Sequence, residues 1–418
     1  MAEQAVTDKQ KLDTLAIEAG RVFTPTTPID ERALFAGRRR QLQKVTDVIN
    51  QKGQHAVIFG ERGVGKTSLS NVLSSFLASP RNGVVLSPRV NCDSQDTFES
   101  VWRKVLTQIT RFRANRTGFT PDITPRRRPV AQELPSPVTP DAIREMLSNL
   151  ALGSLPILII DEFDRLPQNV KASFADTIKS LSDHAINATV ILVGVADTIN
   201  DLIKEQQSVE RALVQIRMPR MSNSEIGEII DNGLQRLGMT IEPNAKARIT
   251  ALSQGLPHYT HLLARDSARS ALALSSLHIT LQIVDEAIRK ALEDAQQSIQ
   301  SAYHKATMSP RKNNLFGDVL LACAVAETDE LGFFAAQDIR GPMQVVTGKK
   351  YDIPSYAQHL NDFCDVKRGP ILEKTGAKRR FRFRFVNPLM QPYVIMQGFA
   401  AGKLHGFQFP ESQKGGAR

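Results

Sequence analysis

Short apolar runs and helix-like segments alternate along the first half of the chain. Strands are predicted at residues 56–59, 84–86, 155–160 and 189–193, and helices at 39–52 and 66–77. Continuously apolar strands separated by helices are typical of a parallel sheet that is covered on both faces. The pattern therefore predicts an α/β domain over residues 36–220.

Two segments depart from this alternation. Residues 1–35 predict a short polar helix followed by a loop rich in Pro and Thr. Residues 111–140 are basic, rich in Pro and without an apolar period, so we interpret them as a flexible insertion or surface loop.

The second half of the chain is mainly helical. Residues 221–305 predict a helical lid that follows the sheet. Residues 310–400 predict a third unit, which begins with an apolar helix at 315–326, continues with two shorter helices and closes with a hairpin over 371–385. Three helices and a hairpin predict a winged helix-turn-helix domain. Residues 401–418 predict a tail.

Length and composition narrow the class of protein. A chain of 418 residues is longer than one hydrophobic core usually grows, so two or three domains are expected. The apolar fraction of 41% and the charged fraction of 23% are typical of a soluble globular protein. The longest apolar stretch, 319–326, is far shorter than a membrane helix, and the three cysteines are widely spaced. We therefore expect a cytoplasmic protein with no membrane partner.

The net charge of +10 is concentrated in two segments. Residues 111–140 contribute +4 and residues 367–384 contribute +7, so the remainder of the chain is close to neutral. A concentrated basic surface favours a polyanionic partner.

A phosphate-binding motif lies directly between a predicted strand and a predicted helix. The segment Gly60-Glu-Arg-Gly-Val-Gly-Lys-Thr67 matches GxxxxGK[ST] in full. Its glycines let backbone N–H groups surround phosphates, Lys66 can reach the β- and γ-phosphates, and the Thr67 hydroxyl can bind Mg²⁺. ATP and Mg²⁺ are therefore the predicted cofactors. The predicted nucleotide-binding residues of this loop are Gly60, Glu61, Arg62, Gly63, Val64, Gly65, Lys66, Thr67 and Ser68.

An acidic motif follows the phosphate-binding loop along the chain, as expected for an ATPase. The apolar strand 157–160 ends in Asp161 and Glu162. We expect Asp161 to hold Mg²⁺ through water and Glu162 to orient or deprotonate the attacking water. Asp164 and Arg165 are equally well explained as a solvated helix start.

Together these motifs resemble the AAA+ ATPases, particularly the archaeal and eukaryotic origin-recognition initiators, and also the bacterial STAND-type relatives. The resemblance spans roughly residues 20–400. It implies that Gly37 and Arg38 lie beside the adenine, and that residues 90–92 end the second strand. It also implies that Arg211 is an arginine finger that reaches a neighbouring subunit's nucleotide in an oligomer.

Two positions depart from the family pattern. The sensor position on the fourth strand is usually Asn or Thr, whereas here only Asp197 or Thr198 is near it. The lid motif ends in His258, which the resemblance implies is a nucleotide contact. The family usually has an arginine there, and histidine is not reliably charged at pH 7. These departures affect hydrolysis more than ATP binding, so we expect a slow, switch-like ATPase.

The C-terminal hairpin carries the strongest concentration of positive charge. Arg380, Arg382 and Arg384 alternate with three phenylalanines, which places the arginines on one face of a strand and the rings on the other. With Lys378 and Arg379 at the turn, this wing is suited to phosphate contacts with weak sequence preference.

Other basic or helical segments are less suited to DNA. The helix at 354–365 carries two Asp and no Lys or Arg, which is poor chemistry for reading the major groove. The run 126–128 is either a second DNA contact or a solvated group of charges.

Two hypotheses for function follow from the sequence. The first is an AAA+ ATPase that acts as a nucleotide-dependent switch and engages DNA through its winged helix. The alternative is a STAND-like signalling or defence ATPase whose winged helix binds a protein partner. Both require ATP, and either can act as a homo-oligomer.

Overall fold

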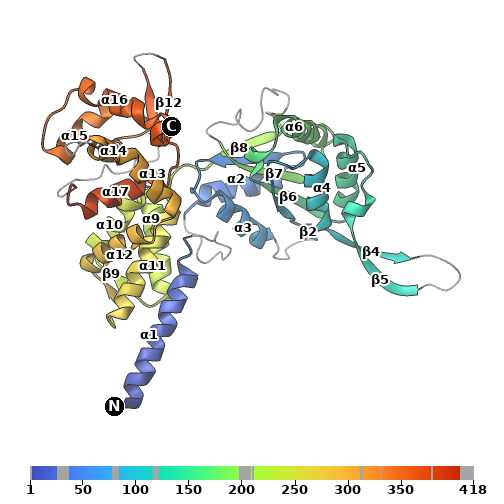
Figure 1. The fold of residues 1–418 in the computed structure, drawn as a ribbon. Helices are drawn as coiled ribbons and strands as arrows, with labels where there is room; N and C mark the ends of the chain where they lie inside the picture. Colours follow the sequence, from blue (N-terminus) through green and yellow to red (C-terminus); the bar gives the residue numbers. More distant parts are fainter. Residues whose placement is uncertain are drawn as a thin grey trace.

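A computed structural model gives the fold of the chain (Figure 1). It describes residues 2–25, 37–77, 84–115, 122–196, 209, 211–310, 314–329, 331–377 and 380–404. Figure 1 shows two lobes, which we call the sheet lobe (residues 37–217) and the helical lobe (residues 2–25 and 220–404). Among the helices of these ranges, none combines the length and apolar character that crossing a membrane requires.

The sheet lobe is built on a parallel sheet whose strand order is β2-β6-β7-β1-β8, with β3 also paired to β6. The strands are β1 (His55–Gly60), β2 (Val85–Leu86), β3 (Arg89–Asn91), β6 (Leu155–Asp161), β7 (Thr189–Val195) and β8 (Leu213–Arg217). The surrounding helices are α2 (Arg39–Ile49), α3 (Lys66–Leu77), α4 (Phe98–Thr107), α5 (Pro140–Ala151), α6 (Gln168–Asp183) and the 3-10 turn η2 (Phe163–Arg165).

Alternate residues of the central strands enter two separate cores. Ala56 and Ile58 of β1 pack with α2 and α3, whereas Val57 and Phe59 pack with α4, α5 and α6. The sheet is therefore covered by helices on both faces. The predicted α/β fold with a parallel sheet is confirmed.

The expectation of a loop over residues 111–140 is wrong for its described part. Strands β4 (Thr110–Asn115) and β5 (Asp122–Pro129) form an antiparallel hairpin that projects from the sheet lobe (Figure 1), and η1 (Val130–Glu133) follows. Pairing satisfies the backbone groups without an apolar alternation in the sequence, which is why pattern reasoning missed it. Beyond the hairpin, Val130, Leu134 and Val138 are buried in the core of the sheet lobe.

Five helices form the predicted lid, and a longer helix packs against it. The lid contains α9 (Asn223–Arg236), α10 (Pro243–Ser253), α11 (Pro257–Ala273), α12 (Leu281–Glu293), α13 (Gln297–Thr307) and the short parallel pair β9 (Thr240–Ile241) and β10 (His278–Ile279). A capping box of Ser222 and Glu225 starts α9. Helix α1 (Ala2–Val22) lies against α11, and Phe23 is fully buried edge-on to the ring of His261.

The C-terminal unit combines helices with a small antiparallel sheet. Its elements are α14 (Phe316–Val325), β11 (Phe334–Ala335), η3 (Ala336–Ile339), α15 (Arg340–Thr347), α16 (Ile353–Phe363), η4 (Val366–Arg368), β12 (Leu372–Thr375), β13 (Arg382–Phe385) and α17 (Met390–Ala400). The strand order is β11-β13-β12, so the expected hairpin gains a third strand. Helix α17 was not expected, and it joins the lid and this unit into one continuous apolar core.

Candidate functional site

The phosphate-binding motif forms the turn between β1 and α3. A side chain at Gly60 would place its Cβ 2.3 Å from the Met218 carbonyl oxygen, so only glycine fits there. Lys66 begins α3 and is only 7% exposed. Its Nζ donates to the carbonyl oxygens of Gly60 (2.9 Å) and Glu61 (2.7 Å). The hydrogen-bond acceptors that the loop offers to Lys66 are therefore backbone carbonyls, which carry no net charge.

Burial controls the charge of this lysine. Desolvation lowers the pKa of Lys66 to about 8, against the opposing effect of the nearby carboxylates of Asp164, Asp161 and Glu61. A largely buried cation whose hydrogen-bond acceptors are neutral carbonyls is suited to receive an anion such as a phosphate.

The acidic pair lies at the carboxyl end of β6, as the sequence predicts. Asp161 is buried, and its Oδ1 accepts a hydrogen bond from the Glu162 backbone N–H at 2.8 Å. Glu162 has a left-handed backbone with φ of 55°, which is unusual for a residue other than glycine and is frequent at functional sites. Its carboxylate forms an ion pair with Arg165 at 2.7 Å, and both side chains are about half exposed.

Arg89 is a site residue that sequence reasoning missed. It lies on β3, and its Nη2 donates to Asp161 Oδ2 at 2.8 Å. Its Nη1 donates to Asn71 on α3. The side chain of Gln108 brackets the Arg89 backbone, accepting from its N–H at 3.1 Å and donating to its carbonyl oxygen at 2.7 Å. No motif marks this arginine, because its role depends on the pairing of β3 with β6.

Asp164 also belongs to the site. Its Oδ1 accepts a hydrogen bond of 2.8 Å from the Val195 N–H at the end of β7, and its charge raises the pKa of Lys66. The sequence alone explained Asp164 equally well as a solvated helix start. The predicted sensor Asp197, together with Thr198, lies outside the described residues.

Gly37 and Arg38 connect the site to the lid. Both have left-handed backbones, and their N–H groups donate to Glu228 and Glu225 of α9 at 3.1 Å each. The guanidinium of Arg38 is buried, and its Nη2 donates to the carbonyl oxygens of Val64 (3.1 Å) and Pro219 (2.5 Å). Its Nε and Nη1 are buried without a partner among the described residues. Desolvation lowers the pKa of this group.

The lid approaches the loop at the start of α11. A Cβ at Gly65 would lie 4.0 Å from Pro257 Cγ. In the structure, Nδ1 of the predicted nucleotide contact His258 is hydrogen-bonded to the Pro25 carbonyl oxygen at 2.7 Å, and burial lowers the pKa of His258. The structure thus places His258, on α11, in contact with the segment that follows α1.

The predicted arginine finger lies away from this chain's own loop. Arg211 is exposed and precedes β8, which runs parallel to β1. It therefore stands at the amino edge of the sheet, whereas the phosphate-binding loop is at the carboxyl edge. Gln54 Nε2 donates to its carbonyl oxygen at 3.2 Å.

The phenylalanines and arginines of β13 separate onto two faces as expected. Phe383 and Phe385 are buried, whereas Arg380 and Arg382 are exposed. Lys378 and Arg379 lie outside the described residues.

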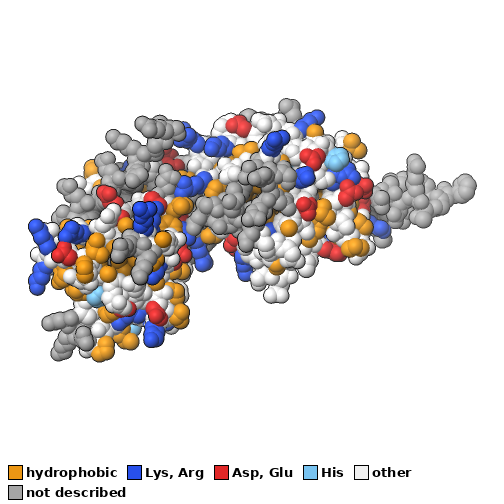
Figure 2. All heavy atoms as spheres, turned by 90° about the horizontal axis from the view of Figure 1, so that it is seen from above, with side chains coloured by type: hydrophobic (Ala, Val, Ile, Leu, Met, Phe, Trp, Pro, Cys, Tyr) orange, Lys and Arg blue, Asp and Glu red, His pale blue; other side chains and the backbone are white. Residues whose placement is uncertain are grey.

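Two of these arginines already have acidic partners within the unit. Arg382 Nη1 pairs with Asp329 at 2.8 Å, and Arg384 pairs with Glu373. On the face shown in Figure 2, basic side chains of the helical lobe are interspersed with acidic and apolar ones. Arg128 of the basic run 126–128 is exposed, and the side chains of residues 126 and 127 are outside the described part.

Part of this chain is similar to a known protein family, and its fold is similar to solved structures. Residues 49–203 match the family model described as an AAA domain. The ORC2 protein of Aeropyrum pernix, solved as ADPNP–ADP complexes, shares 14% identity at a TM-score of 0.50, with 92% of this chain and 98% of that chain covered. Cdc6p of Pyrobaculum aerophilum shares 14% identity at a TM-score of 0.45, with 92% and 98% covered. ORC1 of Aeropyrum pernix in complex with DNA also gives 14% and 0.45, with 92% and 97% covered. No curated protein matches the sequence.

Residues 49–203 match the AAA domain family model, and the α/β fold of the chain is similar to that of the ORC2 protein of Aeropyrum pernix. The identification of the fold made from the two sequence motifs is confirmed.

Proposed function

We propose that this chain binds ATP, hydrolyses it slowly and acts as a nucleotide-dependent switch that engages DNA through its C-terminal unit. The observation that carries the proposal is the buried Lys66 in a complete phosphate-binding loop, next to the acidic ends of β6. We interpret the C-terminal unit, residues 310–400, as a winged helix, and residues 36–220 and 221–305 as the ATPase domain and its lid.

The donor set at the carboxyl edge of the sheet fits ATP with Mg²⁺. The loop amides and Lys66 would hold the phosphates, and Gly37 and Arg38 would lie beside the base. Thr67 and Asp161 would hold Mg²⁺, which neutralises phosphate charge when bound. Within the described residues no group of three or more His, Cys, Asp or Glu forms a metal cage, and Mg²⁺ commonly takes only one or two protein ligands beside phosphate.

The residues of this chain explain why turnover would be slow. Glu162 would orient the attacking water or take its proton, but its carboxylate is paired with Arg165. That ion pair must open before Glu162 can act on water. Lys66 must also leave the Gly60 and Glu61 carbonyls before it can contact phosphate.

A substitution of Glu162 tests this assignment. Glu162→Gln keeps the size of the side chain but removes the base, so ATP binding should persist while turnover falls about 10²–10⁴-fold. Radiolabelled ATP binding and phosphate release measure the two quantities separately. Hydrolysis at the wild-type rate in Glu162→Gln would show that another group activates water.

The position of Arg211 supports a shared site between subunits. We propose that it reaches the nucleotide of a neighbouring copy, since it is exposed at the edge opposite its own loop. Mixing Arg211→Ala with Lys66→Ala protein should restore ATPase activity in mixed oligomers. Activity no higher than the sum of the two variants alone would count against a shared site.

The alternative function is favoured by a specific observation on the C-terminal unit. Arg382 and Arg384 are paired with carboxylates, and α16 carries no Lys or Arg. A STAND-like ATPase whose winged helix binds a protein would have such a surface. Measuring DNA affinity in variants of β13, described in the Discussion, separates the two functions.

A further inference from the structure

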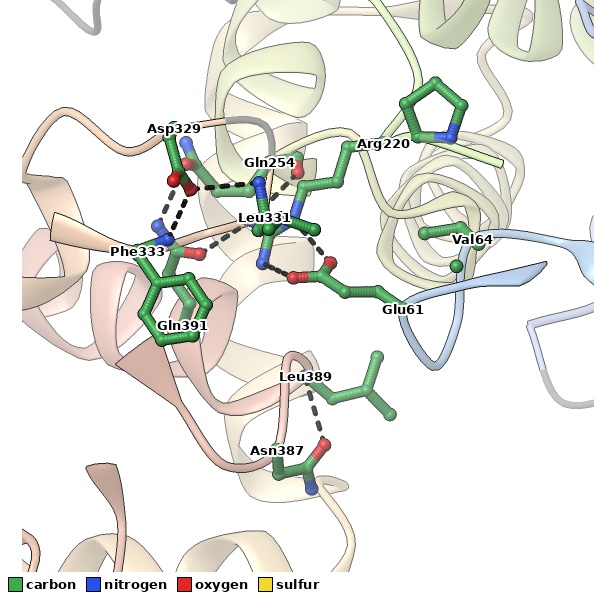
Figure 3. Close-up of polar contacts among 12 residues, drawn as sticks. Glu61, Val64, Arg220, Gln254, Asp329, Leu331, Phe333, Asn387, Leu389 and Gln391 are labelled. Carbon is green, nitrogen blue, oxygen red and sulfur yellow. Dashed lines mark hydrogen bonds and ion pairs between the residues drawn. The ribbon is translucent and has the colours of Figure 1, made fainter. Parts of the chain in front are cut away.

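Arg220 lies at a junction between the phosphate-binding loop, the lid and the C-terminal unit (Figure 3). Its Nε donates to Glu61 Oε2 at 2.8 Å and its Nη2 to Glu61 Oε1 at 3.2 Å, which is a bidentate ion pair. Its Nη1 donates to Gln391 Oε1 at 2.6 Å and to the Gln254 carbonyl oxygen at 3.4 Å. One guanidinium therefore contacts the loop, the end of α10 and the start of α17.

Gln391 anchors this junction in the C-terminal unit. It is buried, and its Nε2 donates to the carbonyl oxygen of Ala324 at the end of α14 at 2.8 Å. Both ends of the Gln391 amide are thus fixed, one by Arg220 and one by α14. A shift of Arg220 would leave the Gln391 oxygen without its strongest donor.

The turn of the C-terminal unit that contains Gly332 packs against the Glu61 side chain. A Cβ at Gly332 would lie 2.9 Å from Glu61 Oε1, so the turn approaches the carboxylate closely. The N–H groups of Leu331 and Phe333 donate to Asp329 Oδ1 at 2.9 and 2.8 Å, and Asp329 also pairs with Arg382 of β13. The turn therefore links the phosphate-binding loop to the basic strand.

A second contact lies beside the first. Leu389 Cδ2 would be 3.4 Å from a Cβ at Gly63, and the Leu389 carbonyl oxygen accepts a hydrogen bond of 2.7 Å from Tyr259 in the lid. A small pocket lined by Glu61, Arg217, Arg220 and Leu331 borders the turn.

We propose that Arg220 is a positioning residue that couples the conformation of the phosphate-binding loop to that of the C-terminal unit. The inference rests on the proposed binding of ATP at this loop. A phosphate that takes Lys66 from the Gly60 and Glu61 carbonyls releases the backbone that carries the Glu61 side chain. The Glu61–Arg220 ion pair then rearranges, and the turn that holds Asp329, Leu331 and Phe333 loosens from the loop together with Arg382. The ion pair thus stabilises the nucleotide-free arrangement.

Hydrogen–deuterium exchange of the full chain tests this coupling. A non-hydrolysable ATP analogue should speed exchange of the Leu331 and Phe333 amides about tenfold or more in the wild type. Arg220→Ala should exchange quickly at these amides without nucleotide and change little when the analogue is added. Arg220→Lys keeps the charge but cannot bind both Glu61 oxygens as the guanidinium does, so its exchange rate at these amides should lie between those of the wild type and Arg220→Ala.

Nucleotide affinity separates this coupling from a merely structural role. Loss of a structural contact in the loop would weaken nucleotide binding, whereas loss of the proposed coupling should tighten it. Because the ion pair favours the nucleotide-free state, Arg220→Ala and Glu61→Gln should bind the analogue about fivefold or more tightly than the wild type. The matched control is Lys246→Ala, which removes the Lys246–Asp231 ion pair elsewhere in the lid and should change neither quantity.

The outcomes separate this inference from the proposed function. If the wild type binds the analogue and exchange of the turn is unchanged, the coupling is wrong and the ATPase assignment stands. If Arg220→Ala weakens nucleotide affinity and leaves exchange as in the wild type, Arg220 serves only the structure of the loop. If the wild type fails to bind nucleotide, the proposed function fails, while the nucleotide-free comparison of wild type with Arg220→Ala still decides whether the junction holds the turn.

Discussion

The cations of the nucleotide site and those of the C-terminal unit have different partners. Lys66 and Arg38 are buried, and their side chains donate to backbone carbonyl oxygens. Arg382 and Arg384 lie on a partly exposed strand and pair with Asp329 and Glu373. A buried cation among neutral acceptors favours an anionic ligand, whereas a cation paired with a carboxylate must first give up that partner. The structure thus supports nucleotide binding more directly than DNA binding.

Removing the arginines of β13 and Arg380 just before it should have the largest effect if DNA binds there. Replacing Arg380, Arg382 and Arg384 with Ala should lower DNA affinity and reduce the slope of log affinity against log salt by about 2.7 for three phosphate contacts. Fluorescence anisotropy over a series of salt concentrations measures both. Glu373→Gln should instead raise the affinity, because it frees Arg384 from its carboxylate partner.

The control for that experiment is Arg248→Ala, which breaks an ion pair with Asp285 in the lid. It should leave DNA affinity and its salt dependence as in the wild type. If the triple variant behaves like this control, β13 does not contact DNA, and the protein-binding alternative becomes the better account of the C-terminal unit.

The Arg89–Asp161 pair offers the next test of the nucleotide site. Arg89 fixes the carboxylate that we assign to Mg²⁺, so Arg89→Ala should raise the Mg²⁺ concentration needed to tighten ATP binding by about tenfold. Arg89→Lys should restore part of the loss. ATP titrations at several Mg²⁺ concentrations measure the effect, and binding in EDTA should be equal in all three proteins. Weakened binding in EDTA would instead indicate general damage to the loop.

The pH dependence of ATP affinity tests the charge of Lys66. Its pKa of about 8 in the nucleotide-free protein means that ATP, which requires the charged form, should bind best below pH 8 and about tenfold more weakly for each further unit. Since the unfolded lysine keeps its proton to higher pH, stability of the nucleotide-free protein should rise between pH 8 and 10.5. An ATP affinity that stays constant from pH 7 to 9.5 would contradict the assigned pKa.

Local motifs made much of the fold and site predictable. The loop from Gly60 to Thr67 and the pair Asp161–Glu162 follow apolar strands directly, so their position at the sheet edge follows from strand polarity alone. The alternation of β13 is equally local, and its phenylalanines are buried as predicted.

The residues that the sequence missed act through contacts between distant segments. Arg89 reaches Asp161 only because β3 pairs with β6, with Arg89 opposite Ile159. The hydrogen bonds of His258 to Pro25 and of Arg220 to Gln391 arise from packing within the helical lobe. The hairpin β4–β5 is held by backbone pairing, which leaves no period in the side chains. Neither spacing nor composition encodes these contacts.

The central claim is that ATP binds at the loop that ends with Lys66 and Thr67. Isothermal titration with ATP and Mg²⁺ should give one site per chain in the wild type and at least about 100-fold weaker binding in Lys66→Ala, since each tenfold loss corresponds to about 1.4 kcal/mol. Both proteins should be shown to fold by thermal unfolding. A folded Lys66→Ala protein that binds ATP with wild-type affinity would contradict the account.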